Sequence, residues 1–83
     1  MNDEPIFQAG GFHVESSYDD TWCVYDEWMH RAFLYFATQE EAVGAATRLA
    51  VAAATSPADI EAEYQRLIVL ARQSLESAGV PAA

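Results

Sequence analysis

Cys23, His13 and His30 are the thiol and imidazole side chains of this sequence, types that often serve as nucleophiles or metal ligands. A Cys–His nucleophilic pair needs a third group to orient the base, and backbone amides to hold an oxyanion. One cysteine and two histidines also lack the paired spacing of a zinc site. Cys23 falls in a predicted strand, where a thiol is far more often a small packing residue. We therefore expect no catalysis, no metal and no cofactor.

Carboxylates occur in three adjacent pairs, Asp19-Asp20, Asp26-Glu27 and Glu40-Glu41. Neighbouring side chains do not project to one point, and no calcium-binding loop pattern surrounds them. The first two pairs are typical of turns and the third of a helix start. The Gly10-Gly11 pair precedes a predicted strand and no helix, so it does not form a phosphate-binding loop.

Net charge separates the remaining classes of function. Thirteen acidic residues stand against four arginines and no lysine, which gives a net charge of −9 on 83 residues. Such a field repels nucleic acid and anionic membranes, and it attracts basic protein surfaces. Direct nucleic-acid binding would require a basic patch. Acidity also promotes solubility, so a purely solubilising role stays open.

Length and cysteine content point to one small domain over residues 1–83. Cys23 has no second cysteine with which to form an internal disulfide. The first residues lack the basic and apolar pattern of a secretory signal, and no apolar run approaches the roughly 20 residues that span a bilayer. We expect a cytoplasmic protein without membrane contact.

Pro5 and the Gly10-Gly11 pair predict a loose segment at 1–10, and hydrophobic alternation then predicts a β-meander over 12–36. Its strands begin at Phe12, at Thr21 and at Arg31, with a wide turn over 26–30. Trp28 is costly to leave in that turn, so we expect a shorter turn or a ring folded back over the sheet. The third strand is apolar on both faces, which predicts cover on both sides or an interface.

Two helices follow the meander. Thr38 and Glu41 form a predicted capping box for a helix over 38–54. Ser56 and Pro57 suit the start of a second helix over 57–78, and Gly79 suits its C-terminal cap before a tail at 79–83. The predicted fold is α+β: a three-stranded antiparallel β-meander followed by two α-helices packed on the sheet.

By its length, its acidity, its missing lysine and its lack of a catalytic motif, the chain resembles small acidic inhibitors from phages and mobile elements, including anti-CRISPR proteins. The order Trp22-x-Val24, then Phe36-x-Thr38-x-Glu40-Glu41-Ala42, is also similar to small β-β-β-α domains. The anti-CRISPR resemblance implies binding to a CRISPR effector subunit in the host cytoplasm and a block to DNA recruitment.

The sequence thus predicts a non-enzymatic inhibitor that occupies a basic nucleic-acid-binding surface, as a monomer or homodimer. Distributed carboxylates can compete with phosphates for such a surface, and aromatic side chains can anchor the contact. The alternative is a self-associating structural or accessory module, suggested by the apolar third strand and the alanine-rich first helix. The predicted partner-binding residues are Asp19, Asp20, Tyr25, Asp26, Glu27, Trp28, Glu40 and Glu41.

Overall fold

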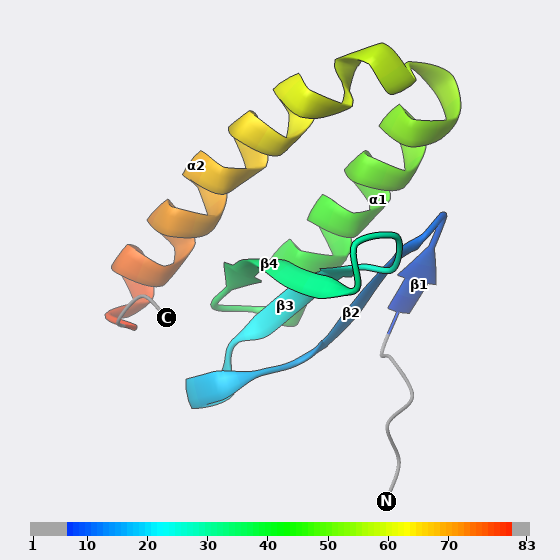
Figure 1. The fold of residues 1–83 in the computed structure, drawn as a ribbon. Helices are drawn as coiled ribbons and strands as arrows, with labels where there is room; N and C mark the ends of the chain where they lie inside the picture. The colour runs from blue at the N-terminus through cyan, green and yellow to red at the C-terminus, as the bar shows by residue number, and fades with distance from the viewer. Residues whose placement is uncertain (1–6, 81–83) are drawn as a thin grey trace, which may run out of the picture.

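The computed structural model describes residues 7–80 as an antiparallel sheet with two helices packed on one of its faces (Figure 1). The predicted α+β class is confirmed, but the sheet has four strands and not three. Their order in the sheet is that of the sequence. The elements are β1 (Phe7–Ala9), β2 (Phe12–Ser16), the 3-10 turn η1 (Tyr18–Asp20), β3 (Trp22–Asp26), β4 (Arg31–Phe36), α1 (Gln39–Thr55), the 3-10 turn η2 (Pro57–Asp59) and α2 (Ile60–Ala78).

The additional strand, β1, lies inside the segment predicted to be loose. Phe7 pairs with Val14 and Ala9 with Phe12. Gly10 and Gly11 form the connecting turn with φ of 53° and 89°, a left-handed geometry that glycine adopts without a Cβ clash. Residues 1–6, the rest of the segment predicted to be loose, lie outside the described residues.

Strand alternation separates a helix-facing surface from an open surface. Val14, Val24 and Leu34 lie in register across β2, β3 and β4, and each is at most 1% exposed beneath the helices. His13 and Tyr25, which are opposite each other and stacked, project to the other face of the sheet, which no helix or strand of residues 7–80 covers (Figure 1). The predicted alternation in the first strand is therefore confirmed.

A β-bulge interrupts the pairing of β3 with β4. Val24 pairs with Leu34 while Tyr25 pairs with Ala32, so Phe33 has no partner on β3. Phe33 packs against the core together with Leu34. Of the two alternatives predicted for this strand, cover on both faces is not met within residues 7–80, because both helices lie on one side, and an interface there stays a prediction (Figure 1).

The helices begin and end close to their predicted bounds. Thr38 caps α1 by accepting a hydrogen bond from the Glu41 amide at 3.2 Å. The helix expected at 57–78 is instead a 3-10 turn followed by α2, and Ser56 makes no side-chain cap bond. Gly79 ends α2 in the left-handed conformation, as predicted, while residues 81–83 of the tail lie outside the described residues. No helix within residues 7–80 is long and apolar enough to cross a membrane.

Candidate partner-binding surface

The predicted partner-binding residues fall into two groups at opposite ends of the sheet. One group, 25–28, spans the end of β3 and the turn into β4. The other comprises η1 with Asp19 and Asp20, and the start of α1 with Glu40 and Glu41. The start of α1 and η1 lie at the same end of the strands, because Phe36, the last residue of β4, pairs with Trp22, the first residue of β3. The five residues of β3 place the two groups about 16 Å apart.

Asp26 is buried and therefore supports the fold. Only 5% of the surface of this residue is exposed. One carboxylate oxygen accepts hydrogen bonds from the amides of Trp28 at 2.9 Å and Met29 at 3.2 Å. The other accepts from the Tyr64 hydroxyl at 3.0 Å. The prediction that Asp26 is a turn residue available to a partner is thus corrected: it closes the turn and joins it to α2.

Trp28 occupies the most exposed position among the large apolar side chains of the described chain. It is 85% exposed, and the neighbouring Met29 is 59% exposed. One edge of the indole lies against Gly11, where a Cβ would come within 3.4 Å of Nε1. Of the two expectations for Trp28, a ring folded back over the sheet is therefore wrong. It stands at the tip of the turn with most of its surface in solvent.

Beside this turn, His13 lies between two carboxylates on the open face of the sheet. Its Nδ1 is 2.9 Å from Oε2 of Glu27, and its Nε2 is 3.0 Å from Oε2 of Glu15. Gln8 donates to the same Glu27 oxygen at 2.7 Å. The imidazole also stacks on Tyr25 with ring centroids 4.7 Å apart.

The environment of His13 favours its cationic form. Burial is the largest single effect and lowers the pKa of His13, but the hydrogen bonds to Glu27 and Glu15, together with the charges of these carboxylates, outweigh it, so the pKa lies above its ordinary value of 6.5. Sequence reasoning treated His13 only as a weak catalytic candidate. The available signal was its position two residues before Glu15 on one outward-facing side of a strand.

The second group forms an acidic end to the molecule. Asp19 and Asp20 adopt left-handed backbone geometry, with φ of 47° and 61°, and both are exposed. No hydrogen bond or ion pair within residues 7–80 engages the side chains of Asp19, Asp20 or Glu40. Glu76, near the C-terminal end of α2, lies close to η1, because Glu76 and Tyr18 of η1 line the same hollow. Sequence reasoning did not include Glu76, since only the antiparallel path of α2 brings it there.

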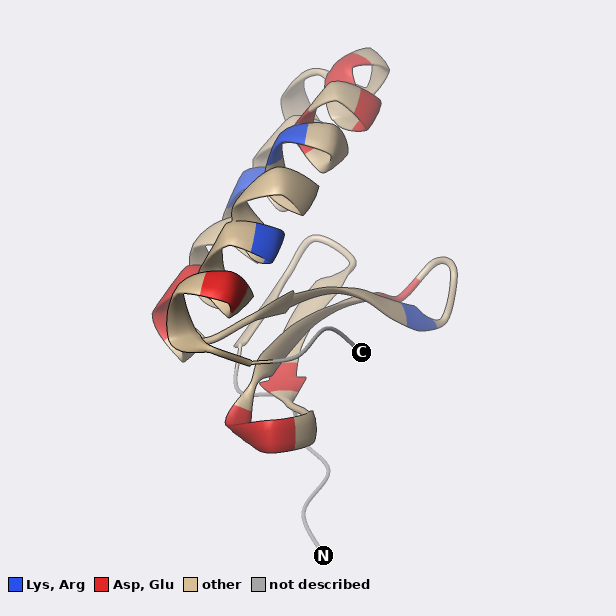
Figure 2. Cartoon of the chain, turned by 90° about the vertical axis from the view of Figure 1, so that its left-hand side faces the viewer, with Lys and Arg blue, Asp and Glu red and all other residues tan. Residues whose placement is uncertain are grey.

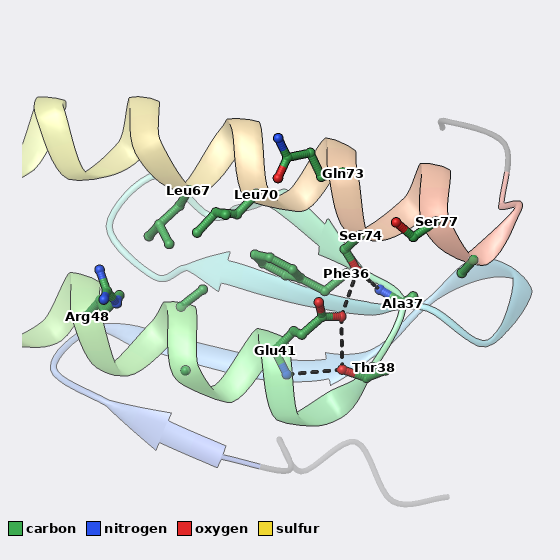
Figure 3. A pocket seen from close by; sticks show the side chains of 13 residues that line it. Phe36, Ala37, Thr38, Glu41, Arg48, Leu67, Leu70, Gln73, Ser74 and Ser77 are labelled. Atoms are coloured by element: carbon green, nitrogen blue, oxygen red, sulfur yellow. Dashed lines mark hydrogen bonds between the residues drawn. The ribbon is translucent and has the colours of Figure 1, made fainter.

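The carboxylate of Glu41 accepts hydrogen bonds from other residues of the same chain. Its Oε1 accepts from the hydroxyl of Thr38 at 3.0 Å and from that of Ser74 at 2.7 Å, and Ser74 in turn accepts from the Ala37 amide at 2.9 Å. These bonds join the start of α1 to α2 at the rim of a groove of about 660 Å³ between the helices (Figure 3). In a complete capping box this carboxylate would accept from the Thr38 amide, but here it accepts from the Thr38 hydroxyl instead.

Arg31 begins β4 opposite Asp26, and Arg72 lines the same hollow as Tyr18 and Glu76, whereas Arg48 and Arg66 lie apart from both groups on the helices. Figure 2 shows basic segments midway along α1 and α2, with acidic segments toward the ends of the helix pair. Arg48 and Arg66 both contact Glu63, at 3.4 and 2.7 Å. The charges of η1 and of the α1 start are therefore not neutralised by these arginines.

Cys23 is a buried packing residue, as predicted, with 4% of its surface exposed. Burial raises the pKa of its thiol, and the charge of Glu15 adds to that effect. A thiol of this kind is a poor nucleophile. The described part of the chain holds no cluster of three or more His, Cys, Asp or Glu side chains placed to bind a metal ion.

Comparison of the chain with protein-family models, with curated proteins and with solved structures found no match. The surface itself is therefore the only basis for a functional assignment. Within residues 7–80 this surface presents an exposed aromatic turn at Trp28 and exposed carboxylates at η1 and at the start of α1.

Proposed function

We propose that this protein is a non-enzymatic inhibitor that binds a basic, nucleic-acid-binding surface of another protein. The observation that carries the proposal is Trp28, 85% exposed on a chain of net charge −9. Tryptophan is among the residues that dominate binding energy at protein interfaces. Its ring also attracts arginine and lysine side chains through cation–π contact.

The carboxylates around the molecule support the same kind of partner. Glu27 lies next to Trp28 in sequence, with 34% of its side chain exposed. Asp19, Asp20 and Glu40 present further negative charge about 16 Å away, across the length of β3. A partner surface that normally holds phosphates can accept carboxylates at both places. The resemblance to anti-CRISPR inhibitors gives one specific form of this proposal, in which the partner is a CRISPR effector subunit.

A comparative affinity capture tests the general proposal. The wild-type protein, Trp28→Ala and the double variant Asp19→Asn/Asp20→Asn are used as baits in a cell lysate, and retained proteins are quantified by mass spectrometry. Asparagine is chosen because it tolerates the left-handed geometry at both positions. We expect a basic, nucleic-acid-binding protein to be retained by the wild type, to be lost with Trp28→Ala and to elute as salt is raised.

The control is Asp59→Asn/Glu61→Gln, which removes the same charge at the start of α2. Retention should survive in this variant and fall in the Asp19→Asn/Asp20→Asn variant. Equal retention by all baits, or insensitivity to salt, contradicts the proposal. For the CRISPR form, expression of the protein in a strain with active CRISPR immunity should restore plaque formation by a targeted phage.

A second function, self-association, is supported by the outer edge of β4, which pairs with no other strand of residues 7–80. Hollows of about 360 and 430 Å³ lie between this strand and α2, and they share Phe33 and Ile68. An unpaired edge strand with apolar surroundings can pair with the same strand of a second copy. Two copies of net charge −9 repel each other, which favours a basic partner over a second copy. Sedimentation at micromolar concentration distinguishes a dimer from a monomer.

A further inference from the structure

The cluster around His13 joins three separate parts of the sheet. Gln8 comes from β1, His13 and Glu15 from β2, and Glu27 from the turn between β3 and β4. The oxygen Oε2 of Glu27 receives hydrogen bonds from both Gln8 and His13. Tyr25 of β3 lies flat against the imidazole, with an angle of 14° between the two rings.

The two contacts of His13 require a proton on each ring nitrogen. An ionised carboxylate can only accept a hydrogen bond, and a neutral imidazole carries only one N–H donor. With neutral His13, one ring nitrogen would direct its lone pair at a carboxylate oxygen about 3 Å away. Only the imidazolium satisfies Glu15 and Glu27 together.

The same cluster holds the turn that carries Trp28. The amide of Glu27 donates to the carbonyl of Gly11 at 2.9 Å, and the indole of Trp28 lies against Gly11. The side chain of Glu27 thus joins the turn to β1 through Gln8 and to β2 through His13. Its backbone amide joins the turn separately to Gly11, between β1 and β2. Trp28 follows directly after this doubly held residue.

We infer that protonated His13 is a positioning residue for Trp28: after loss of its proton the ring can donate to only one of Glu15 and Glu27, so the Glu27 side chain is held less firmly and presentation of the indole weakens. The inference rests on the proposed function, because it assigns the control of that same binding turn. The titratable groups that face His13 are Glu15 on its own strand, Glu27 on the turn and Tyr25 on β3. Cys23 pairs with Glu15 in the sheet register, and Gln8 on β1 carries no charge.

The test is an NMR titration of the free, full-length protein between pH 6 and pH 9. The ring resonances of His13 are followed together with the indole N–H signals of both tryptophans. We expect His13 to titrate with a midpoint above 6.5, and the Trp28 indole signal to move with that same midpoint. Trp22, which lies at the far end of β3, serves as the internal control and should not follow it.

The matched variant is His13→Gln, in which the side chain cannot titrate. In this variant the Trp28 signal should lose its pH dependence over the same range. A His13 midpoint at or below 6.5, or a Trp28 signal that ignores His13, overturns the inference. So does a Trp28 shift that persists unchanged in His13→Gln.

The binding measurement separates the inference from the proposed function. Once a partner is captured, its affinity is compared below and above the His13 midpoint for the wild type and for His13→Gln. A several-fold loss at high pH in the wild type alone supports the inference. Trp28-dependent binding without pH dependence refutes the inference and leaves the proposed function intact. Absence of any Trp28-dependent partner refutes the proposed function, while the NMR result stands by itself.

Discussion

The hydroxyl of Tyr64 on α2 donates a 3.0 Å hydrogen bond to Asp26 at the end of β3. The two residues are 38 positions apart, and their contact is a direct polar link between the helix layer and the turn that carries Trp28. Burial raises the pKa of Tyr64 well above its ordinary value, and the hydrogen bond to Asp26 raises it further. The hydroxyl therefore remains a donor throughout the physiological range.

Breaking this link should destabilise the fold. We expect Tyr64→Phe to lower the free energy of unfolding by roughly 1–2 kcal/mol, since one hydrogen bond to a charged group is lost. Asp26→Ala should cost more, roughly 3 kcal/mol, because two turn amides also lose their acceptor. Urea unfolding measures both values, and the double variant should cost less than their sum. Strict additivity would show that the bond contributes nothing.

Ser74 provides a second test of how the layers are joined. Ser74→Ala should lower the free energy of unfolding by about 1–2 kcal/mol, because the Ala37 amide loses its acceptor and Glu41 loses a donor. Ser77 lines the same groove but makes no such bond (Figure 3). Ser77→Ala should therefore change stability by less than about 0.5 kcal/mol. Equal effects of the two substitutions in thermal or urea unfolding would contradict the assignment.

Two glycines should respond to alanine in opposite directions. A Cβ at Gly44 in α1 meets nothing within 4 Å, so Gly44→Ala should stabilise the protein by about 0.5–1 kcal/mol through helix propensity. Gly10 has φ of +53°, and a Cβ there would come 3.0 Å from the Cβ of Ala50. Gly10→Ala should destabilise by roughly 1–2 kcal/mol. Differential scanning calorimetry on both variants checks the opposite signs.

The raised pKa of His13 predicts how stability depends on pH. Because the folded state binds the His13 proton more tightly than the unfolded chain, the resulting stabilisation is complete below about 6.5 and is lost as pH rises through the folded pKa. The stability of the wild type relative to His13→Gln should therefore fall between pH 6 and pH 9. Urea midpoints measured across this range give the difference. A constant or rising difference would contradict a raised pKa.

Local sequence patterns were sufficient for the main elements of the fold. The alternation of Phe12 and Val14, the Thr38 cap and the Gly79 terminus each depend on residues within a few positions. Strand β1 was missed because three residues are too few to show a period. The Gly10-Gly11 pair before β2 is nevertheless a hairpin signal of its own.

The candidate site depended on contacts that local patterns do not encode. The burial of Asp26 could not be predicted from its neighbours in sequence, because its hydrogen-bond donor Tyr64 comes from α2, 38 residues away. The His13 cluster requires the register that sets His13 opposite Tyr25 and the turn that returns Glu27 to it. Trp28 was identified as unusual from the sequence, because a tryptophan inside a predicted turn conflicts with the cost of exposing it.

Phe33, the unpaired residue of the bulge, is not needed for the pairing of β3 with β4. Pairing on one side of it sets Val24 against Leu34, and pairing on the other sets Tyr25 against Ala32. Removing Phe33 would thus restore uninterrupted pairing without shifting the partners on either side. The residue behaves as a one-residue insertion whose ring lies 4.9 Å from that of Tyr64, edge to face. A chain without Phe33 would keep the same strand pairing but lose the closer of two edge-to-face contacts to Tyr64, with the ring of Phe12 still 6.5 Å away.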